Sequence, residues 1–327
     1  MAGERLSLAL DAGQMDLPET GRIAVFGPRE LADIAALPRE RVVVIQTTKP
    51  AYDVFAHAGY EVALAPEGDF AAAVVVVPRA KALAHLRIAQ AAALGGAVYV
   101  DGQKTDGVDS LLKACKKRAD VGGSFSKAHG KLFWFQGGDF SEWTQSETSE
   151  IDGGFETRPG VFSADGIDPA SRALSAALPD KLGKHVADLG AGWGYLSREI
   201  LKRSDVEDLY LVEADHTALD CARVNVTDPR ASFHWADATA WEPRARMNAV
   251  VMNPPFHTGR AADPDLGRAF IAAAARMLSP SGPLWMGANR HLPYEATLET
   301  HFAKVEEVTG DNRFKILRAE RPARARR

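Results

Sequence analysis

Short runs of consecutive apolar residues alternate along the chain with longer amphipathic stretches. This alternation is typical of a parallel-sheet α/β domain, in which most buried strands are followed by a helix. The pattern occurs twice. In the first half, strands are predicted at 22–27, 41–47, 61–66, 72–78, 96–102 and 131–137. In the second half, they are predicted at 185–190, 208–213, 231–236, 247–253, 283–289 and 313–320. Because many of these runs are continuously apolar, we expect sheets that are buried on both faces.

A polar, glycine-rich segment, residues 137–160, separates the two sets of strands. It shows no sustained periodicity, and this predicts a linker or an exposed connection. We therefore expect two domains, residues 1–145 and 146–327.

The two halves carry different residues where their predicted strands end. After the first strand of each set stand "VFGPREL" and "DLGAGWG", and after the second stand "IQTT" and "VEAD". The later strand that ends in "VVMNPPF" is matched in place by "VVVVPRA". We interpret this as a duplicated fold whose first copy lacks the chemical residues, with two unrelated α/β domains as the alternative.

Composition narrows the class of protein. The chain has 327 residues and a formal net charge of −4, so bulk charge does not indicate nucleic-acid binding. Two cysteines exclude a disulfide framework and favour a reducing compartment, which we expect to be the cytoplasm. No zinc-ligand spacing, signal peptide or membrane span is recognisable, so we expect no metal and no membrane partner.

The stretch "NPPF", Asn253 to Phe256, follows a buried strand directly. Proline ends the strand and stiffens the loop. The side-chain oxygen of Asn253 and the carbonyl of Pro254 are both acceptors, and together they could hold an exocyclic amine. Phe256 offers a face on which an attached ring could stack. We therefore expect Asn253, Pro254, Pro255 and Phe256 to form a catalytic loop that works mainly by positioning.

A glycine series follows the first strand of the second half. Asp188 ends that strand, and Gly190, Gly192 and Gly194 let the backbone turn tightly beside a ligand. Nicotinamide enzymes share this kind of turn, and a tight turn without a ligand is the alternative.

Two further carboxylates end the next two strands. Glu213 lies 25 positions after Asp188 and could accept both hydroxyls of a ribose. Asp237 could take the amino group of an adenine. A solvated carboxylate for the first and a turn aspartate for the second are the alternatives.

Together, Asp188–Gly194, Glu213, Asp237 and Asn253–Phe256 resemble a class I S-adenosylmethionine-dependent methyltransferase. The segments 158–174, 288–295 and 310–321, together with a degenerate first half, are similar to the bacterial ribosomal RNA guanine-N2-methyltransferases of the RsmC/RlmG type. The resemblance implies an α/β fold of two tandem Rossmann-like domains with seven-stranded mixed sheets, the N-terminal copy degenerate.

The resemblance also implies S-adenosylmethionine as the donor and the N2 atom of a guanine in ribosomal RNA as the acceptor, with 16S rRNA in the 30S subunit favoured. The residues expected to bind the donor are Asp188, Gly190, Gly192, Gly194, Glu213, Asp237 and Asn253. Phe162, Phe256, His257 and Phe314 are the residues that it suggests for substrate binding. The N-terminal domain would then dock RNA or the ribosome, or support the catalytic domain.

Other functions stay open at this point. The same loop serves enzymes that methylate a protein glutamine or a DNA adenine. A non-catalytic ribosome-assembly factor that binds RNA is a third possibility. An oxidoreductase would give no role to the NPPF loop.

Overall fold

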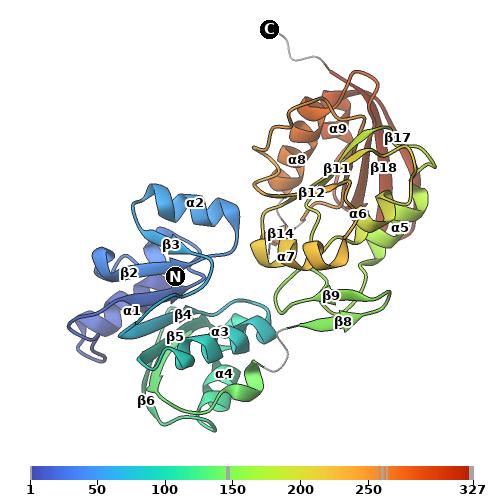
Figure 1. Ribbon diagram of the computed structural model, residues 1–327. Helices are drawn as coiled ribbons and strands as arrows, with labels where there is room; N and C mark the ends of the chain where they lie inside the picture. The colour runs from blue at the N-terminus through green and yellow to red at the C-terminus, as the bar shows by residue number, and fades with distance from the viewer. Residues whose placement is uncertain (1, 145–147, 256, 259–260, 263, 324–327) are drawn as a thin grey trace. The chain divides into compact units, whose positions relative to one another are not determined.

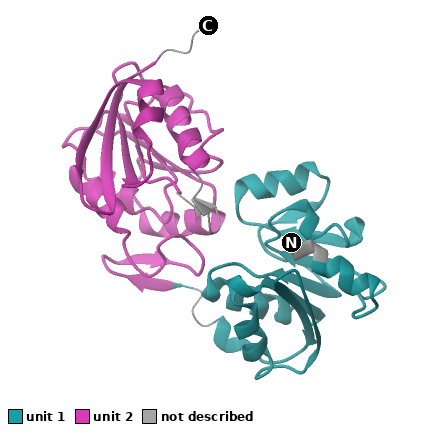
Figure 2. Ribbon diagram, turned by 180° about the vertical axis from the view of Figure 1, so that it is seen from behind, with its two compact units in different colours: residues 1–148 teal, residues 149–327 magenta. Residues whose placement is uncertain are grey.

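The computed structural model describes residues 2–144, 148–255, 257–258, 261–262 and 264–323. The chain divides into two compact units, residues 1–148 (unit 1) and 149–327 (unit 2), which Figure 2 colours separately. Each unit has its own sheet and its own hydrophobic core.

Unit 1 contains a seven-stranded mixed sheet of order β3-β2-β1-β4-β5-β7-β6. Its strands are β1 (Ile23–Phe26), β2 (Val42–Ile45), β3 (Glu61–Ala63), β4 (Ala72–Val76), β5 (Ala97–Gln103), β6 (Val121–Lys127) and β7 (Gly130–Gln136). Its helices are α1 (Ala2–Asp11), α2 (Lys49–His57), α3 (Lys81–Ala93) and α4 (Val108–Cys115). Apolar residues of α1 and α2 pack on one face of the sheet, and those of α3 and α4 pack on the other.

Unit 2 repeats this order as β12-β11-β10-β13-β16-β18-β17. Its sheet strands are β10 (His185–Leu189), β11 (Asp208–Glu213), β12 (Ala231–Trp235), β13 (Ala249–Met252), β16 (Leu284–Asn289), β17 (Phe302–Gly310) and β18 (Phe314–Pro322). Its helices are α5 (Pro169–Ala177), α6 (Tyr195–Ile200), α7 (His216–Asn225), α8 (Pro264–Met277) and α9 (Glu295–His301). Figure 1 labels β11, β12, β17 and β18 of this sheet and the helices α5 to α9. One core joins the sheet to α5, α6 and α7, and another joins it to α8 and α9.

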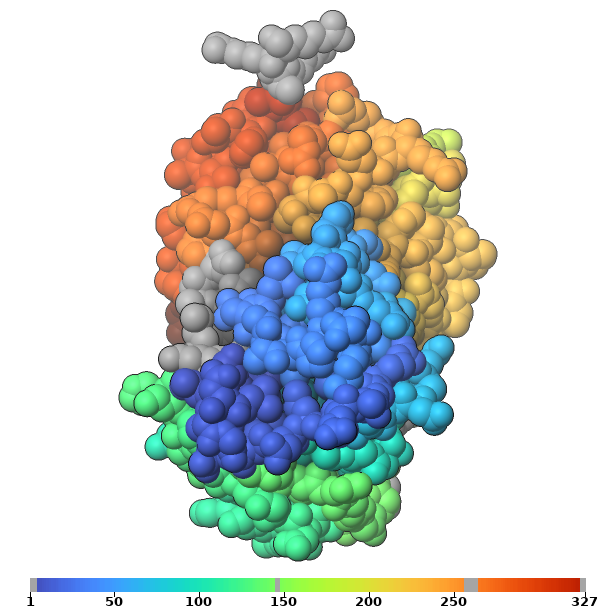
Figure 3. All heavy atoms as spheres, turned by 90° about the vertical axis from the view of Figure 1, so that its left-hand side faces the viewer, coloured from blue at the N-terminus to red at the C-terminus, as the bar shows by residue number. Residues whose placement is uncertain are grey.

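The central strands of unit 2 bury both of their faces. Val250 of β13 belongs to the core beneath α8, and its neighbour Val251 belongs to the core beneath α5. Successive side chains of a strand point to opposite faces, so a continuous apolar run suits a sheet covered on both sides. In the space-filling view of Figure 3, the residues that begin unit 1 (dark blue) lie on the surface of that unit.

The order of the strands decides where a ligand site can form. Strands β10, β11, β12, β13 and β16 run parallel, so their carboxyl ends share one edge of the sheet. The chain moves outward from β10 in one direction to β11 and β12, and in the other to β13 and β16. Open α/β sheets bind ligands at this kind of switch point, outside the carboxyl ends of the strands.

The expected pair of seven-stranded mixed sheets is confirmed, with two corrections. The strands β6 and β17 were not predicted, and both lie at a sheet edge. The segment 137–160 is not wholly irregular, because it contains the hairpin β8 (Ser149–Ile151) and β9 (Phe155–Thr157). Phe155 of this hairpin is buried against Trp193, which anchors the segment to unit 2. A second short hairpin pairs β14 (His257–Thr258) with β15 (Ala261–Ala262).

Every helix in the described residues is too short or too polar to cross a membrane. Within that same part of the chain, no three histidine, cysteine or acidic side chains are grouped as metal ligands would be. Cys115 and Cys221 are buried, free thiols.

Candidate active site

The glycine turn after β10 adopts the backbone that its sequence requires. Gly190, Gly192 and Gly194 have φ values of 73°, 56° and 92°, in the region that residues with a side chain rarely adopt. The amide of Gly190 donates to the carbonyl of Val212 in β11, over 2.8 Å. A Cβ built on Gly192 would meet no atom within 4 Å, so open space lies beside this part of the turn.

Glu213 ties the end of β11 to this turn. Its Oε2 accepts a hydrogen bond from the amide of Gly192 over 2.7 Å, and its Oε1 accepts one from the amide of Asp215 over 2.8 Å. Burial raises the pKa of Glu213 to about 6, against the opposing effect of these backbone hydrogen bonds. A carboxylate offers about four lone-pair positions, so Glu213 can still accept from the hydroxyl groups of a ligand.

Asp188, at the end of β10, is fully buried. Its Oδ2 accepts a hydrogen bond from the hydroxyl of Ser197 over 2.6 Å, whereas Oδ1 is buried and has no partner among the described residues. Burial raises the pKa of Asp188 to about 7, the Ser197 hydrogen bond opposes the shift, and the charge of Glu213 adds to it. Two carboxyl groups of raised pKa therefore flank the glycine turn.

Asp237 follows β12 and shapes a turn. Its Oδ1 accepts hydrogen bonds from the amide and the hydroxyl of Thr239, over 2.8 and 2.7 Å. Its carbonyl accepts from the amide of Trp241 over 2.9 Å. The turn aspartate considered as an alternative is thus present. It places a carboxyl group directly after the strand beside β11.

Asn253 follows β13 and is held by α5. Its Nδ2 donates to Oδ2 of Asp168 over 2.9 Å and to the hydroxyl oxygen of Ser171 over 2.8 Å. Its Oδ1 is buried and has no partner in the described residues. A buried amide oxygen without a hydrogen bond is costly, so this atom is suited to accept from a bound ligand.

The rest of the NPPF loop lies against the glycine turn. A Cβ built on Gly190 would lie 3.9 Å from Cδ of Pro255, so the two loops are close neighbours. Pro254 is buried and Pro255 is exposed. Phe256 lies outside the described residues. His257 begins the strand β14, and its side chain is likewise not described.

Two further expected residues, Phe162 and Phe314, lie on segments that border this region. The side chain of Phe162 is 64% exposed, and its carbonyl accepts a hydrogen bond from the indole of Trp193, in the glycine turn, over 2.9 Å. Phe314 pairs with Asn289, the last residue of β16, and so lies at the carboxyl edge of the sheet. Phe162 thus lies beside the glycine turn, and Phe314 lies beside the end of β16.

At the position of unit 1 that matches Glu213, the hydrogen bond to the neighbouring turn runs in the opposite direction. The matched residue is Gln46, at the end of β2. Its Nε2 donates to the carbonyl of Pro28 over 3.1 Å, in the turn after β1. In unit 2 a carboxylate accepts from the turn, whereas in unit 1 an amide donates to it. The acidic group that could bind a ribose is therefore absent at this position of unit 1.

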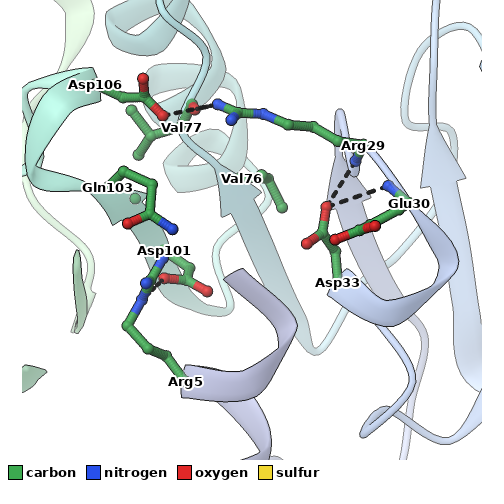
Figure 4. Close-up of a pocket in the computed structure, with 10 residues that line it drawn as sticks. Arg5, Arg29, Glu30, Asp33, Val76, Val77, Asp101, Gln103 and Asp106 are labelled. Atoms are coloured by element: carbon green, nitrogen blue, oxygen red, sulfur yellow. Dashed lines mark hydrogen bonds and ion pairs between the residues drawn. The ribbon is translucent and has the colours of Figure 1, made fainter. Parts of the chain in front are cut away.

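Unit 1 also lacks a side-chain acceptor at the position that matches Asn253. Val77 stands there, and its carbonyl accepts a hydrogen bond of 2.6 Å from Arg29. Arg29 also donates to Asp106 over 2.9 Å, and Figure 4 shows its side chain reaching across the sheet edge. The cavity at this edge has a volume of about 170 Å³. Its polar lining comes from Arg5, Arg29, Glu30, Asp33, Asp101, Gln103 and Asp106.

The contacts of Asn253 were not predicted. The Asp-Pro pair at 168–169 signals the start of α5, and Asp168 does cap that helix. No sequence signal links this cap to Asn253, 85 positions later. Ser197, which donates to Asp188, was missed for the same reason.

Known proteins resemble this chain over most of its length. Ribosomal RNA small subunit methyltransferase C of Hahella chejuensis is 28% identical over 276 residues, covering 80% of each chain. The protein of the same name from Salmonella choleraesuis is 29% identical over 231 residues, covering 68% of this chain and 67% of the relative. The solved Thermus thermophilus 16S rRNA N2 G1207 methyltransferase, in complex with AdoMet and guanosine, superimposes with a TM-score of 0.80. That match has 24% identity and covers 98% of this chain and 91% of the other, which confirms the tandem fold.

The family comparison covers unit 2. Residues 152–318 match the family model described as methyltransferase small domain. This range includes the glycine turn, Glu213, Asp237 and the NPPF loop. The chain therefore belongs to the methyltransferase small domain family.

Proposed function

We propose that this protein transfers a methyl group from S-adenosylmethionine to the exocyclic N2 of a guanine in ribosomal RNA. We propose 16S rRNA in the cytoplasmic 30S subunit as the substrate. The observation that carries the proposal is the amide of Asn253. Both hydrogens of its Nδ2 have acceptors, while its buried Oδ1 has none among the described residues. The loop thus offers an acceptor to an amine.

The residues after β10, β11 and β12 fit a nucleoside-containing donor. The open space beside Gly192 allows a ligand to approach the main chain. Glu213 would accept from the ribose hydroxyls, and Asp237 would accept from the adenine amino group. We assign Asp188 to the donor site as well, because it lies at the end of β10, directly before the glycine turn. When bound, S-adenosylmethionine supplies an electrophilic methyl group on sulfur.

The NPPF loop would hold the acceptor. Oδ1 of Asn253 and the carbonyl of Pro254 would accept from the two N2 hydrogens, which directs the N2 lone pair toward the methyl group. One carbon–nitrogen bond would form as one carbon–sulfur bond breaks, with S-adenosylhomocysteine as the leaving group, and N2 would then lose a proton to water. The rigid proline loop provides orientation, which is the main source of catalysis in such a site.

We assign the base pocket to four aromatic residues, namely Phe162, Phe256, His257 and Phe314. A guanine inside structured RNA must leave its stack to reach the loop, and an exposed ring such as Phe162 could receive it. Replacing Phe162 with alanine should raise the KM for RNA without lowering the melting temperature. The matched control is Val224→Ala, because Val224 is also exposed, at 53%, but lies on α7.

Ribosomal RNA is supported as the substrate by the relatives. The Hahella and Salmonella proteins are named for the small ribosomal subunit and cover up to 80% of this chain, so both units are matched. The Thermus thermophilus structure holds guanosine as a ligand of that protein. Unit 1 lacks the acidic and amide groups of the site, and we propose that it docks the ribosome or RNA, or supports unit 2.

The test is methyl transfer from labelled S-adenosylmethionine to unmodified 30S subunits, 50S subunits and protein extract in parallel. We expect N2-methylguanosine from 30S subunits. The same product from 50S subunits alone would move the assignment to the large subunit. Label in protein alone would overturn the RNA substrate but keep the amine chemistry.

The variant Asn253→Ala separates the acceptor site from the donor site. We expect it to lose transfer while donor affinity, measured by calorimetry, stays within about twofold, because the expected ribose and adenine contacts, Glu213 and Asp237, lie at other strand ends. Near-normal turnover by this variant would show that the acceptor site has been assigned wrongly.

A further inference from the structure

Asp168 connects the start of α5 to the NPPF loop. It is the N-cap of α5, and its Oδ2 accepts a hydrogen bond from the amide of Ser171 over 2.8 Å. The same Oδ2 atom accepts from Nδ2 of Asn253 over 2.9 Å. One carboxylate oxygen therefore caps a helix and contacts the residue that we propose binds the target amine.

Ser171 completes this contact from the first turn of the helix. Its hydroxyl oxygen lies 2.8 Å from Nδ2 of Asn253, so each Nδ2 hydrogen has an acceptor. Ser171 is 8% exposed, which limits competition from water. Helix α5 itself packs against the strands β16 and β18, so the two acceptors stand on a fixed element.

The carboxylate decides which way the amide of Asn253 faces. A hydroxyl can donate or accept, so Ser171 alone would tolerate either end of the amide. A carboxylate accepts only, and Asp168 would repel the amide oxygen. The nitrogen must therefore face α5, and Oδ1 must face away from it. This is the orientation in which Oδ1 is left without a partner in the described residues.

The strand beside the loop leaves room for this oxygen. A Cβ built on Gly287 of β16 would lie only 3.3 Å from Oδ1 of Asn253. Gly287 has no positive φ, so its backbone does not require glycine. The close approach to Asn253 is a reason for a residue without a side chain here.

We propose that Asp168 and Ser171 are positioning residues that lock the amide of Asn253 with its oxygen toward the substrate. We call this pair of contacts to the Asn253 amide the lock. Because the oxygen end of the amide only accepts, the lock selects a hydrogen-bond donor as the target. On a guanine it favours the exocyclic amine and disfavours the carbonyl oxygen and the unprotonated ring nitrogen. The inference rests on the proposed function, since it assigns residues to the same acceptor site.

Three substitutions separate the lock from the helix cap. Asp168→Ser keeps a good N-cap but shortens the side chain, so the contact with Asn253 is lost. Asp168→Asn keeps both a cap and an acceptor oxygen of the same reach, and serves as the conservative rescue. Ser171→Ala removes one acceptor and favours the helix. The matched control is Ser175→Ala, because Ser175 is equally buried on α5 but contacts Arg172 and Tyr195.

The first readout is independent of methyl transfer. The side-chain amide hydrogens of Asn253 can be identified by NMR as the signals that disappear in Asn253→Ala. In the wild-type protein we expect these hydrogens to exchange with solvent slowly. Ser171→Ala and Asp168→Ser should each speed the exchange at least tenfold, and Ser175→Ala should leave it unchanged.

The second readout is the rate of methyl transfer to 30S subunits. We expect kcat to fall at least tenfold in Asp168→Ser, with a smaller fall in Ser171→Ala and most activity kept in Asp168→Asn. Donor affinity should stay within twofold in all of them. Loss of donor affinity in step with kcat would indicate a structural role and overturn the inference.

The two proposals can fail separately. Rapid exchange of the Asn253 amide in the wild-type protein would overturn the lock, whatever the substrate is. Unchanged kcat in Asp168→Ser, with Asn253→Ala inactive, would also overturn the lock and leave the proposed function standing. Slow exchange that the two lock variants speed, in a protein that modifies no ribosomal RNA, would support the lock and overturn the proposed substrate.

Discussion

The carboxylate of Glu213 holds the backbone amide of Gly192, with 2.7 Å between Oε2 and the amide nitrogen. This contact joins the ends of two neighbouring parallel strands, since Gly192 follows β10 and Glu213 ends β11. One residue therefore both shapes the glycine turn and presents an acidic group beside it. The two parts of the proposed donor site form a single unit.

Replacing Glu213 with glutamine should weaken donor binding. The NH2 end of glutamine cannot accept, so one of the two backbone hydrogen bonds is lost together with the charge. Hydrogen bonds to charged groups contribute about 1.5–3 kcal/mol, so we expect the Kd for S-adenosylmethionine to rise by roughly 10- to 100-fold. Isothermal titration calorimetry would measure the change.

The control for this substitution is Glu207→Gln, because Glu207 pairs with Lys184 at an exposed position next to the same strand. Donor affinity of the wild-type protein should also fall as pH drops through about 6, where Glu213 takes up a proton. Glu213→Gln should lose this particular pH step. Equal donor affinity in the wild type and Glu213→Gln would exclude Glu213 from the donor site.

Asp188 should make the stability of unit 2 depend on pH. Its pKa is raised from 3.8 to about 7, so between these values the folded state binds a proton that the unfolded state has released. The stability that this proton contributes to the folded state is fully present below about pH 4 and is lost as pH rises through 7. A pKa shift of about 3 corresponds to at most ~4 kcal/mol.

The measurement is urea unfolding of the wild type and of Asp188→Asn across this pH range. The variant cannot titrate here, so its stability relative to the wild type should increase from pH 4 to pH 8. A constant difference between the two proteins would mean that folding does not raise the pKa of Asp188.

The substitution Gly287→Ala should impair methyl transfer to RNA without unfolding the protein. The new Cβ would lie 3.3 Å from Oδ1 of Asn253 and 3.8 Å from the carbonyl oxygen of Ala170. The amide would have to shift by a few tenths of an ångström, and small misplacements at a positioning site are costly. We expect Gly287→Ala to lower kcat by about tenfold, measured in the methyl-transfer assay.

Gly166→Ala is the comparison for this variant, since a Cβ at Gly166 meets nothing within 4 Å. It should keep wild-type kcat, and both variants should keep their affinity for S-adenosylmethionine. Wild-type kcat in Gly287→Ala would show that the amide of Asn253 has more freedom than its contacts indicate.

The buried ion pair of unit 1 should dominate the local stability of that unit. Nε of Arg5 lies 2.6 Å from Oδ1 of Asp101, and both side chains are almost fully buried. Even beside Arg5, burial raises the pKa of Asp101 to about 7. Removing one partner of such a pair typically costs about 3–5 kcal/mol, and we expect this from Arg5→Met in urea unfolding of unit 1.

Lys49→Met provides the contrast, because Lys49 pairs with Asp53 at a partly exposed position, where an ion pair contributes about 0–1 kcal/mol. Combining Arg5→Met with Asp101→Leu should recover much of the loss, since no unpaired carboxyl group then remains buried. If the double variant is no more stable than Arg5→Met, the unpaired Asp101 is not the cause of the loss.

The central strands could be predicted from the sequence, whereas the edge strands β6 and β17 could not. Strands such as β13 and β4 are buried on both faces, so their apolar runs are continuous. The edge strand β17 exposes most of its residues, and the edge strand β6 contains glycine and serine. Edge strands pair on one side only and are commonly polar, so they resemble loops in sequence.

The sequence alone predicted the repeated α/β pattern, the positions of the central strands and the polar residues at their carboxyl ends. These features are local, because burial on two faces and the geometry of glycine and proline act within a few residues. Only the tertiary structure decided that α5 places Asp168 and Ser171 on the amide of Asn253, and so which end of that amide is left to accept. A hydrogen bond between side chains 85 positions apart depends on how a helix packs on a sheet, and no periodicity of the chain records it.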